Sequence, residues 1–349
     1  MAPVRRQQMA NRWKPRRVVQ QTVRARVACL GEPLVLVSEA GDPHPAGAEL
    51  NVAVGLAGLG VPASLLGRLG ADEYGVLIRA ALQQRGIDDS AVETDPARPT
   101  GSYSKVTGTD AAGERTTTSR YARAGSAASA MGPDFLDRDE VSAALGAAAI
   151  VHCSGITAAL SDTCRALMCR LLTDRPGIPG LVSFDVNWRE QLWPDADPAV
   201  VLDLADRADL VLVGADEAAR VAGTGDPVAL RRVLPSPATL VVKDGARRAV
   251  AVDRDGVTTE VPALRVDVVE PVGAGDAFAA GYLSGLVRGD DTATCLRRGH
   301  IGAAATLTVA TDWAPPPPAG TLQRLLACSP PEWAATTVTT AGFALPEGM

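Results

Sequence analysis

The chain has 349 residues, of which 46% are hydrophobic and 21% are charged, so it can bury a large core as one α/β domain or as two smaller ones. Its formal net charge of −6 and pI near 5.2 give no general reason to expect nucleic acid as a partner. No apolar run approaches the roughly 20 residues that span a bilayer, so we expect no membrane segment. Its 6 cysteines form no Cys-x2-Cys pair and no secretory leader precedes them, which indicates reduced thiols and a cytoplasmic protein.

The two ends of the chain differ in composition from the middle. Residues 1–26 are rich in arginine and contain no acidic residue, so we expect a basic, solvated, disordered tail. A nucleic-acid arm, an organelle-targeting peptide and a gene start set too far upstream are the alternatives. Four prolines at 315–318 interrupt the fold, and we expect a short helix near 322–326 and a loosely ordered tail over 328–349. A single folded domain is therefore predicted over residues 27–327.

Short apolar runs alternate with stretches of helical composition along this domain. The expected strands are residues 27–30, 148–153, 180–184, 210–213, 240–242 and 249–252. The expected helices are residues 51–59, 73–85, 163–173 and 227–234. The alternation predicts an α/β fold with a largely parallel central sheet and helices on both faces. Ligands bind at the carboxyl ends of strands in such sheets, where Asp185, Asn187, Asp216 and Gly245 fall.

One region breaks the alternation. Residues 100–108 and 114–122 are rich in Thr, Ser, Tyr and Val and flank the sequence DAAG at 110–113, which predicts a β-hairpin. With a short strand near 34–38, this hairpin would form a small second sheet, whose strands fall within about residues 34–48 and 98–124.

Residues 273–276 read GAGD and lie directly before a run of helical composition. Small residues let backbone N–H groups approach an anion, and the start of the helix adds its positive dipole end. A carboxylate here opposes phosphate binding unless it takes a proton from an attacking hydroxyl. The turn therefore predicts a phosphotransferase, with Asp276 as the base and the N–H groups of Ala274, Gly275 and Asp276 stabilising the developing charge.

Two other interpretations of this turn remain. Asp276 is also well placed to be the N-cap of a helix over residues 277–286. A dinucleotide-binding loop is the second, but that fingerprint requires glycine where Phe278 stands. A Walker phosphate loop is excluded because no Gly-x4-Gly-Lys-Ser/Thr occurs in the sequence.

Two segments resemble the signatures of one family. Residues 270–281, EPVGAGDAFAAG, resemble the C-terminal signature of the ribokinase-like (PfkB) carbohydrate kinases, and residues 47–60, GAELNVAVGLAGLG, resemble the N-terminal one. The similarity extends over roughly residues 27–315, and the two signatures occur in the right order, so chance is a poor explanation. The resemblance implies a ribokinase-like fold, ATP and Mg²⁺ as cofactors, and a small sheet that closes over the sugar as a lid. It also implies a homodimer that pairs through this lid, and it leaves activation by a monovalent cation open.

Further segments are similar to the 2-keto-3-deoxygluconate kinase branch of this family: GAELN at 47–51, YARAGSAA at 121–128, DVNWREQLW at 185–193 and, more weakly, TDW at 311–313. The resemblance implies a substrate pocket lined by Gly47, Ala48, Asn51, Tyr103, Tyr121, Arg123, Arg189, Asp276 and Asp312. Arg123 and Arg189 supply forked donors that suit the carboxylate of a sugar acid. The alternative is that Arg123 only pairs with an acid on the lid and that Tyr121 belongs to the core. The chain departs from the family where Ala46 replaces a common glycine and Ala122 a common aromatic residue.

The nucleotide side is also assigned by resemblance. Residues 241–249, VVKDGARRA, resemble the family segment beneath the ATP phosphates and ribose. The implied nucleotide-binding residues are Asn187, Arg189, Lys243, Gly245, Gly273, Ala274 and Gly275. Residues 214–217, GADE, match the family motif Asn-x-x-Glu except at Gly214, so Glu217 would organise Mg²⁺ through water. A hairpin turn with a solvated Lys-Asp pair, and an ordinary acid at a helix start, are the respective alternatives.

The sequence thus predicts an ATP-dependent kinase that transfers the γ-phosphate to 2-keto-3-deoxygluconate. The alternatives are a kinase of fructose, ribose or adenosine on the same fold, and a sugar- or nucleotide-binding protein without turnover. Arg123 and Arg189 discriminate among the kinases, because two arginines facing the pocket favour the acid and an arginine engaged elsewhere favours the neutral sugars. The histidines, His44, His152 and His300, show no ligand spacing and receive no role.

Overall fold

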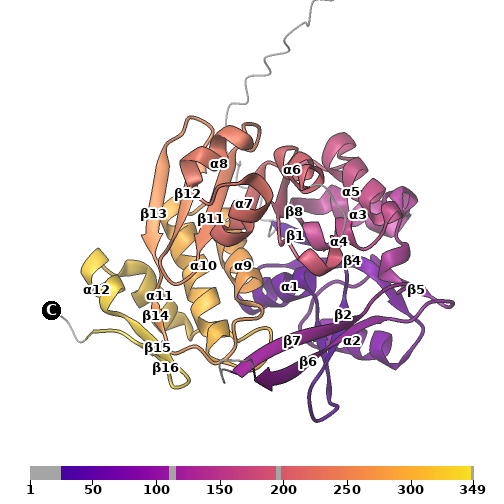
Figure 1. Ribbon diagram of the computed structural model, residues 1–349, viewed down its shortest axis with the longest axis horizontal. Coiled ribbons are helices and arrows are strands. Elements are labelled where there is room, and N and C mark those ends of the chain that lie inside the picture. The colour runs from indigo at the N-terminus through magenta and orange to yellow at the C-terminus, as the bar shows by residue number, and fades with distance from the viewer. Residues whose placement is uncertain (1–24, 110–114, 194–197, 347–349) are drawn as a thin grey trace, which may run out of the picture.

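A nine-stranded sheet forms the centre of the computed structural model, which describes residues 25–109, 115–193 and 198–346 (Figure 1). Its strand order is β13-β12-β11-β10-β9-β8-β1-β4-β5. The strands are β1 (Arg26–Leu30), β4 (Ala63–Gly70), β5 (Val92–Asp95), β8 (Ala148–Ser154), β9 (Leu181–Asp185), β10 (Leu210–Gly214), β11 (Thr239–Asp244), β12 (Arg248–Asp253) and β13 (Thr258–Pro262). All neighbours from β5 to β11 pair in parallel, and β12 and β13 add an antiparallel edge.

Helices cover both faces of this sheet, as the sequence predicts. One face carries α1 (Ala48–Gly58), α2 (Glu73–Gln84), α9 (Ala274–Arg288), α10 (Thr292–Leu307), α11 (Ala319–Ala327) and α12 (Pro330–Ala335). The other carries α3 (Asp139–Ala147), α4 (Gly155–Ala159), α5 (Asp162–Asp174), α6 (Ala199–Asp206), α7 (Ala215–Ala222) and α8 (Pro227–Val233). Successive residues of β1 alternate between the two cores, since Val27 packs in the first and Ala28 in the second. A strand buried on both faces reads as a continuous apolar run, which is why it could be found in the sequence.

A separate four-stranded sheet has the order β3-β2-β6-β7 and lies below α1 in the view of Figure 1. It comprises β2 (Leu34–Val37), β3 (Pro43–Ala46), β6 (Gly101–Thr109) and β7 (Arg115–Ala122), and we call it the small sheet. β6 and β7 pair antiparallel, as the expected hairpin requires. The expected turn at 110–113 lies outside the described residues. Because only residues 31–33 separate β1 from β2, the small sheet is held directly beside the carboxyl end of β1.

The C-terminal segment differs from the expected loose tail over 328–349. After α11, which contains the expected helix near 322–326, α12 is followed by β15 (Thr337–Thr339) and β16 (Gly342–Ala344). These strands pair with β14 (Arg265–Val266) in a three-stranded sheet. Trp333 is only 1% exposed, and its Nε1 donates to the carbonyl of Pro262 at 2.8 Å. The expectation of loose order was therefore wrong for residues 328–346, because one buried tryptophan anchors the segment.

At the other end, the expected basic tail was set slightly too long. Residues 1–24 lie outside the described part of the chain, but Arg26 already begins β1 and forms an ion pair with Asp88. The folded domain therefore begins by residue 26.

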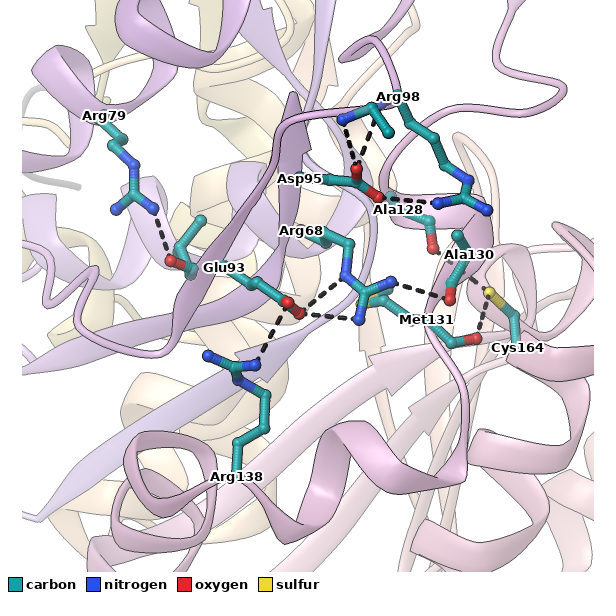
Figure 2. Close-up of polar contacts among 12 residues, drawn as sticks. Arg68, Arg79, Glu93, Asp95, Arg98, Ala128, Ala130, Met131, Arg138 and Cys164 are labelled. Atoms are coloured by element: carbon teal, nitrogen blue, oxygen red, sulfur yellow. Dashed lines mark hydrogen bonds and ion pairs between the residues drawn. The ribbon is translucent and has the colours of Figure 1, made fainter. Parts of the chain in front are cut away.

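Charged side chains tie the edge strand β5 to its surroundings (Figure 2). Arg68 of β4 donates from Nε to Glu93 of β5 at 2.8 Å and from Nη1 to the carbonyl of Ala130 at 2.9 Å. Arg138, just before α3, donates to the other oxygen of Glu93 at 3.2 Å. Such charges mark a sheet edge that is protected from further strand pairing.

Within the described ranges, no helix combines the length and the apolar character needed to cross a membrane.

Candidate active site

A cavity of about 710 Å³ lies between the small sheet and the carboxyl ends of the central strands. The predicted residues that line it are Gly47, Ala48, Asn51, Tyr103, Tyr121, Arg123, Asn187, Arg189, Glu217, Lys243, Gly273, Gly275, Asp276 and Asp312. Two predicted residues are not part of its lining. Ala274 lies within the glycine turn, and Gly245 lies exposed in the turn between β11 and β12.

Glycine is required at two points of the cavity wall. Gly273 has φ 84°, and a Cβ there would lie 2.0 Å from the backbone oxygen of Asp312. Gly47 has φ 128°, and a Cβ there would lie 2.4 Å from the backbone oxygen of Glu32. Each glycine is also the N-cap of a helix, α9 and α1 respectively. The two family signatures thus correspond to two helix starts that meet at the cavity.

The interpretation of Asp276 as a helix N-cap was wrong. α9 begins at Ala274, so Asp276 is the third residue of the helix and Gly273 is its cap. The N–H of Ala274 contacts the carbonyl of Pro271 at 3.4 Å. Gly275 and Asp276 have no acceptor within the helix, because the first N–H groups of any helix lack one. These two N–H groups are therefore the better candidates for holding an anion.

The carboxylate of Asp276 lies beside Asn51, whose Nδ2 donates to Oδ2 at 2.9 Å. Burial raises the pKa of Asp276 to about 7, and Asp185 adds to the rise, while Asn51, Arg189 and Lys243 oppose it. A carboxyl group with this pKa accepts a proton readily near neutral pH, which is the property a general base needs.

Lys243 brings a positive charge to the same turn. Its Nζ donates to Asp185 Oδ2 at 2.8 Å and lies 3.6 Å from the position of a Cβ built on Gly275. Burial alone would lower the pKa of Lys243, but Asp185 and Glu217 hold it above its ordinary value, so the side chain is an ammonium ion. Asp185 Oδ1 is buried and has no hydrogen-bond partner among the described residues.

Glu217 is engaged through both of its oxygens. Oε2 accepts from the N–H of Gly214 at 2.9 Å and so caps α7, and Oε1 pairs with Arg189 Nη1 at 3.1 Å. The helix-start role left open by the sequence is thus present, and the same side chain lines the cavity. Among the described residues, no group of three or more His, Cys, Asp and Glu side chains is placed to hold a metal ion directly.

Aromatic residues of the small sheet form the opposite wall. The rings of Tyr103 and Tyr121 stack at 5.2 Å, and the guanidinium of Arg123 lies 4.1 Å from the centre of the Tyr121 ring. Tyr121 is 38% exposed, so the alternative that it belongs to the core was wrong. Arg123 does pair with an acid, because its Nε lies 3.3 Å from Glu32 Oε2, but Glu32 lies between β1 and β2 and not on the expected lid.

Sequence reasoning missed several residues around the cavity. Asp185 was noted at a strand end but received no role, although the motif DVN signals it. Glu32 and Lys105 have no local pattern, and only the fold brings them to Arg123 and Asp312. His152 and His300 are buried, and burial lowers the pKa of each to about 4, so both are neutral side chains away from the cavity lining.

A largely parallel sheet, a glycine turn at a helix start and a carboxylate with a raised pKa are the features expected of a phosphotransferase. The sequence matches the pfkB family carbohydrate kinases over residues 28–317, and the chain belongs to this family. It is 35% identical over 279 residues to a 2-dehydro-3-deoxygluconokinase of Thermoproteus tenax, covering 74% of this chain and 82% of that protein.

A fructokinase and a solved structure are also similar to this chain. Fructokinase-1 of Zea mays is 31% identical over 249 residues, which cover 70% of this chain and 74% of the maize protein. The crystal structure of a PfkB protein from Polaromonas sp. JS666 superposes with a TM-score of 0.71 at 32% identity, covering 87% of this chain and 99% of that one. The ribokinase-like fold and the sugar kinase class are therefore established, and membership of the family implies ATP as the phosphate donor.

Proposed function

We propose that this kinase phosphorylates the terminal hydroxyl of 2-keto-3-deoxygluconate, with ATP as donor and Mg²⁺ as cofactor. The observation that carries the proposal is that Arg123 and Arg189 line the same cavity as Asp276. A sugar acid brings a carboxylate that fructose and ribose lack, and the fork of a guanidinium matches it. The similarity to a 2-dehydro-3-deoxygluconokinase supports this substrate, whereas the similarity to a fructokinase supports the neutral alternative.

The two arginines are not equivalent. Both line the cavity, which by the criterion stated above favours the sugar acid, and each also pairs with an acid, which counts toward a neutral sugar. In Arg123 it is Nε that lies 3.3 Å from Glu32, and a guanidinium has five N–H donors, so we assign the terminal nitrogens to the substrate. The side chain of Arg189 is 47% exposed and is paired through Nη1. We therefore assign the substrate carboxylate to Arg123 and the border of the nucleotide to Arg189, with Asn187 beside it.

In the proposed reaction, Asp276 accepts the proton of the sugar hydroxyl as its oxygen attacks the γ-phosphorus of ATP. The bond from phosphorus to the bridging oxygen breaks, and ADP leaves. The N–H groups of Gly275 and Asp276 and the ammonium of Lys243 stabilise the charge on the transferred group. Tyr103 and Tyr121 of the small sheet exclude water from the cavity.

The residues present fit a magnesium ion held largely through water. Asp185 Oδ1 is a buried carboxylate oxygen without a partner among the described residues, and it belongs to a side chain that lines the cavity. Both oxygens of Glu217 are engaged, so Glu217 would act only through a bound water. Mg²⁺ neutralises charge on the phosphates when bound.

Activation by a monovalent cation is a separate question, and titration of the enzyme with potassium would answer it.

We extend the proposal to a cytoplasmic homodimer that pairs through the small sheet, as the resemblance to the family implies. Light scattering of the purified protein tests it. A mass of twice 36.0 kDa is expected, and a monomer over a wide concentration range would contradict the dimer.

The test of the substrate compares wild type with Arg123→Met on 2-keto-3-deoxygluconate, its galacto epimer, gluconate, fructose, ribose and adenosine. We expect turnover of the keto-acids by wild type. In the variant, KM for the keto-acid should rise roughly tenfold to a hundredfold, because a charge-assisted hydrogen bond is lost, while any activity on fructose stays unchanged. A wild-type preference for fructose, or an equal loss on both sugars, would refute the sugar-acid assignment. Absence of turnover on every compound would favour a binding protein.

A further inference from the structure

Lys105 of β6 lies between two carboxylates behind the cavity wall. Its Nζ is 3.3 Å from Glu270 Oε2 and 3.2 Å from Asp312 Oδ1. The side chains of Lys105, Glu270 and Asp312 are 12%, 16% and 5% exposed, respectively. This ammonium is therefore largely shielded from water, and its two partners come from segments far apart in the sequence.

Both acids are fixed to the glycine turn. Glu270 Oε1 accepts from the N–H of Val272 at 3.1 Å, which orders the residues that lead into the turn. Asp312 supports the turn from its other side, since its backbone oxygen fills the space that a side chain on Gly273 would occupy. Lys105 thus joins, through its two ion pairs, the two segments that shape the glycine turn at residues 273–276.

The same strand holds Asp312 by a second contact. Tyr103 precedes Lys105 by two residues, so both side chains lie on one face of β6. The hydroxyl of Tyr103 donates to Asp312 Oδ2, while Lys105 takes Oδ1. Because Tyr103 also lines the cavity, the position of the small sheet over the substrate is connected to the geometry of the turn.

The positive charge of Lys105 offsets the negative charges of Glu270 and Asp312. Without the ammonium, two shielded carboxylates would repel each other and would also repel a phosphoryl group bound at the neighbouring turn. Removing one partner of a buried ion pair leaves the other charge uncompensated, and here it would leave two.

We propose that Lys105 is a positioning residue that couples the small sheet to the phosphate-binding turn, so that the turn is ordered for phosphoryl transfer when β6 is seated over the cavity. The inference rests on the carbohydrate kinase activity of the chain and not on which sugar it accepts.

The test uses Lys105→Met, Lys105→Arg, and Lys105→Met combined with Glu270→Gln, on whichever sugar the wild type turns over best. Lys105→Met should lower kcat by roughly tenfold to a hundredfold, as expected for a displaced reactive group, with a smaller change in KM for ATP. Lys105→Arg should recover a large part of the loss because it keeps the charge. Adding Glu270→Gln should raise kcat above that of Lys105→Met alone, because it removes an uncompensated charge.

Arg98→Met is the matched control, since Arg98 forms an ion pair with Asp95 at 3.1 Å shortly before β6 and lies outside the cavity lining. Its kcat should equal that of wild type. A kcat within about threefold of wild type in Lys105→Met would overturn the proposal, as would a double variant no faster than Lys105→Met.

A measurement without a sugar separates this inference from the substrate assignment. Amide hydrogen exchange over residues 270–278 should be faster in Lys105→Met than in wild type and unchanged in Arg98→Met. Unchanged exchange in Lys105→Met would refute the coupling even if no tested sugar were phosphorylated. Lys105→Gln replaces the methionine variant if the latter does not fold, with the same expected and contradicting results.

Discussion

Asp276 combines a position inside the first turn of α9 with a pKa that burial raises to about 7. A carboxylate at a helix start usually gains from the helix dipole, so a raised pKa there indicates a group kept ready to take a proton. Asn51 holds one of its oxygens, and both residues line the cavity.

Asp276→Asn should lower kcat by roughly two to four orders of magnitude, because the variant keeps the size of the side chain and loses the base. Its free energy of unfolding should not fall, since Gly273 and not Asp276 caps the helix. Steady-state assays and urea denaturation measure the two quantities. Asp291→Ala is the control: Asp291 caps α10 by accepting from Thr294 N at 2.7 Å, so replacing it with alanine should cost about 1 kcal/mol of stability and leave turnover unchanged. Substantial activity in Asp276→Asn would contradict the assignment of the base.

The pH dependence of the reaction follows from the same carboxyl group. Since kcat/KM reports the free enzyme, it should fall as pH decreases through about 7, where Asp276 becomes protonated. The folded-state pKa exceeds the ordinary value of 3.8, so the folded protein binds a proton that the unfolded chain releases. The resulting contribution to stability is complete below pH 3.8 and is lost as pH rises through about 7. A profile of kcat/KM that stays flat down to about pH 5 would contradict this account.

At the scale of single residues, the sequence predicts those site residues that lie together in one short motif. Gly273, Gly275 and Asp276 lie in one short motif whose chemistry can be argued from neighbours. Lys105 and Asp312 are 207 residues apart, and nothing in their local sequence connects them. Tertiary contacts of this kind become visible only when the fold is known.

Among the elements, α12 shows how one residue determines whether a segment folds. The segment contains Ser329-Pro330-Pro331, and its composition is typical of a loose end. Trp333 nevertheless buries its ring, and Arg297 lies 5.0 Å from the centre of that ring. Composition could not reveal this, because the receiving surface comes from α10 and β13.

Trp333→Ala should lower the free energy of unfolding by about 3–5 kcal/mol, the usual cost of removing a large buried aromatic side chain. Urea denaturation measures it, with Val257→Ala as the control because Val257 is 62% exposed. The control should differ from wild type by less than about 0.5 kcal/mol. A loss in Trp333→Ala no larger than in the control would mean that the C-terminal segment does not pack as described.

For the whole molecule, the alternation of strands and helices was sufficient to predict the central sheet, because each buried strand is a continuous apolar run. The small sheet followed from Thr-, Ser- and Val-rich residues around a turn. The placement of one sheet against the other was not predictable, since contacts such as those of Asp312 with Tyr103 and Lys105 fix it. The cavity is a product of that placement, since residues of both sheets line it.

The measurement that tests the account most directly is a crystal structure with 2-keto-3-deoxygluconate and a non-hydrolysable ATP analogue. We predict the terminal hydroxyl within about 2.6–3.2 Å of an Asp276 carboxylate oxygen and the sugar carboxylate on Arg123. The γ-phosphate should face the N–H groups of Gly275 and Asp276. A sugar bound with its carboxylate toward solvent, or with no hydroxyl near Asp276, would contradict the proposed reaction.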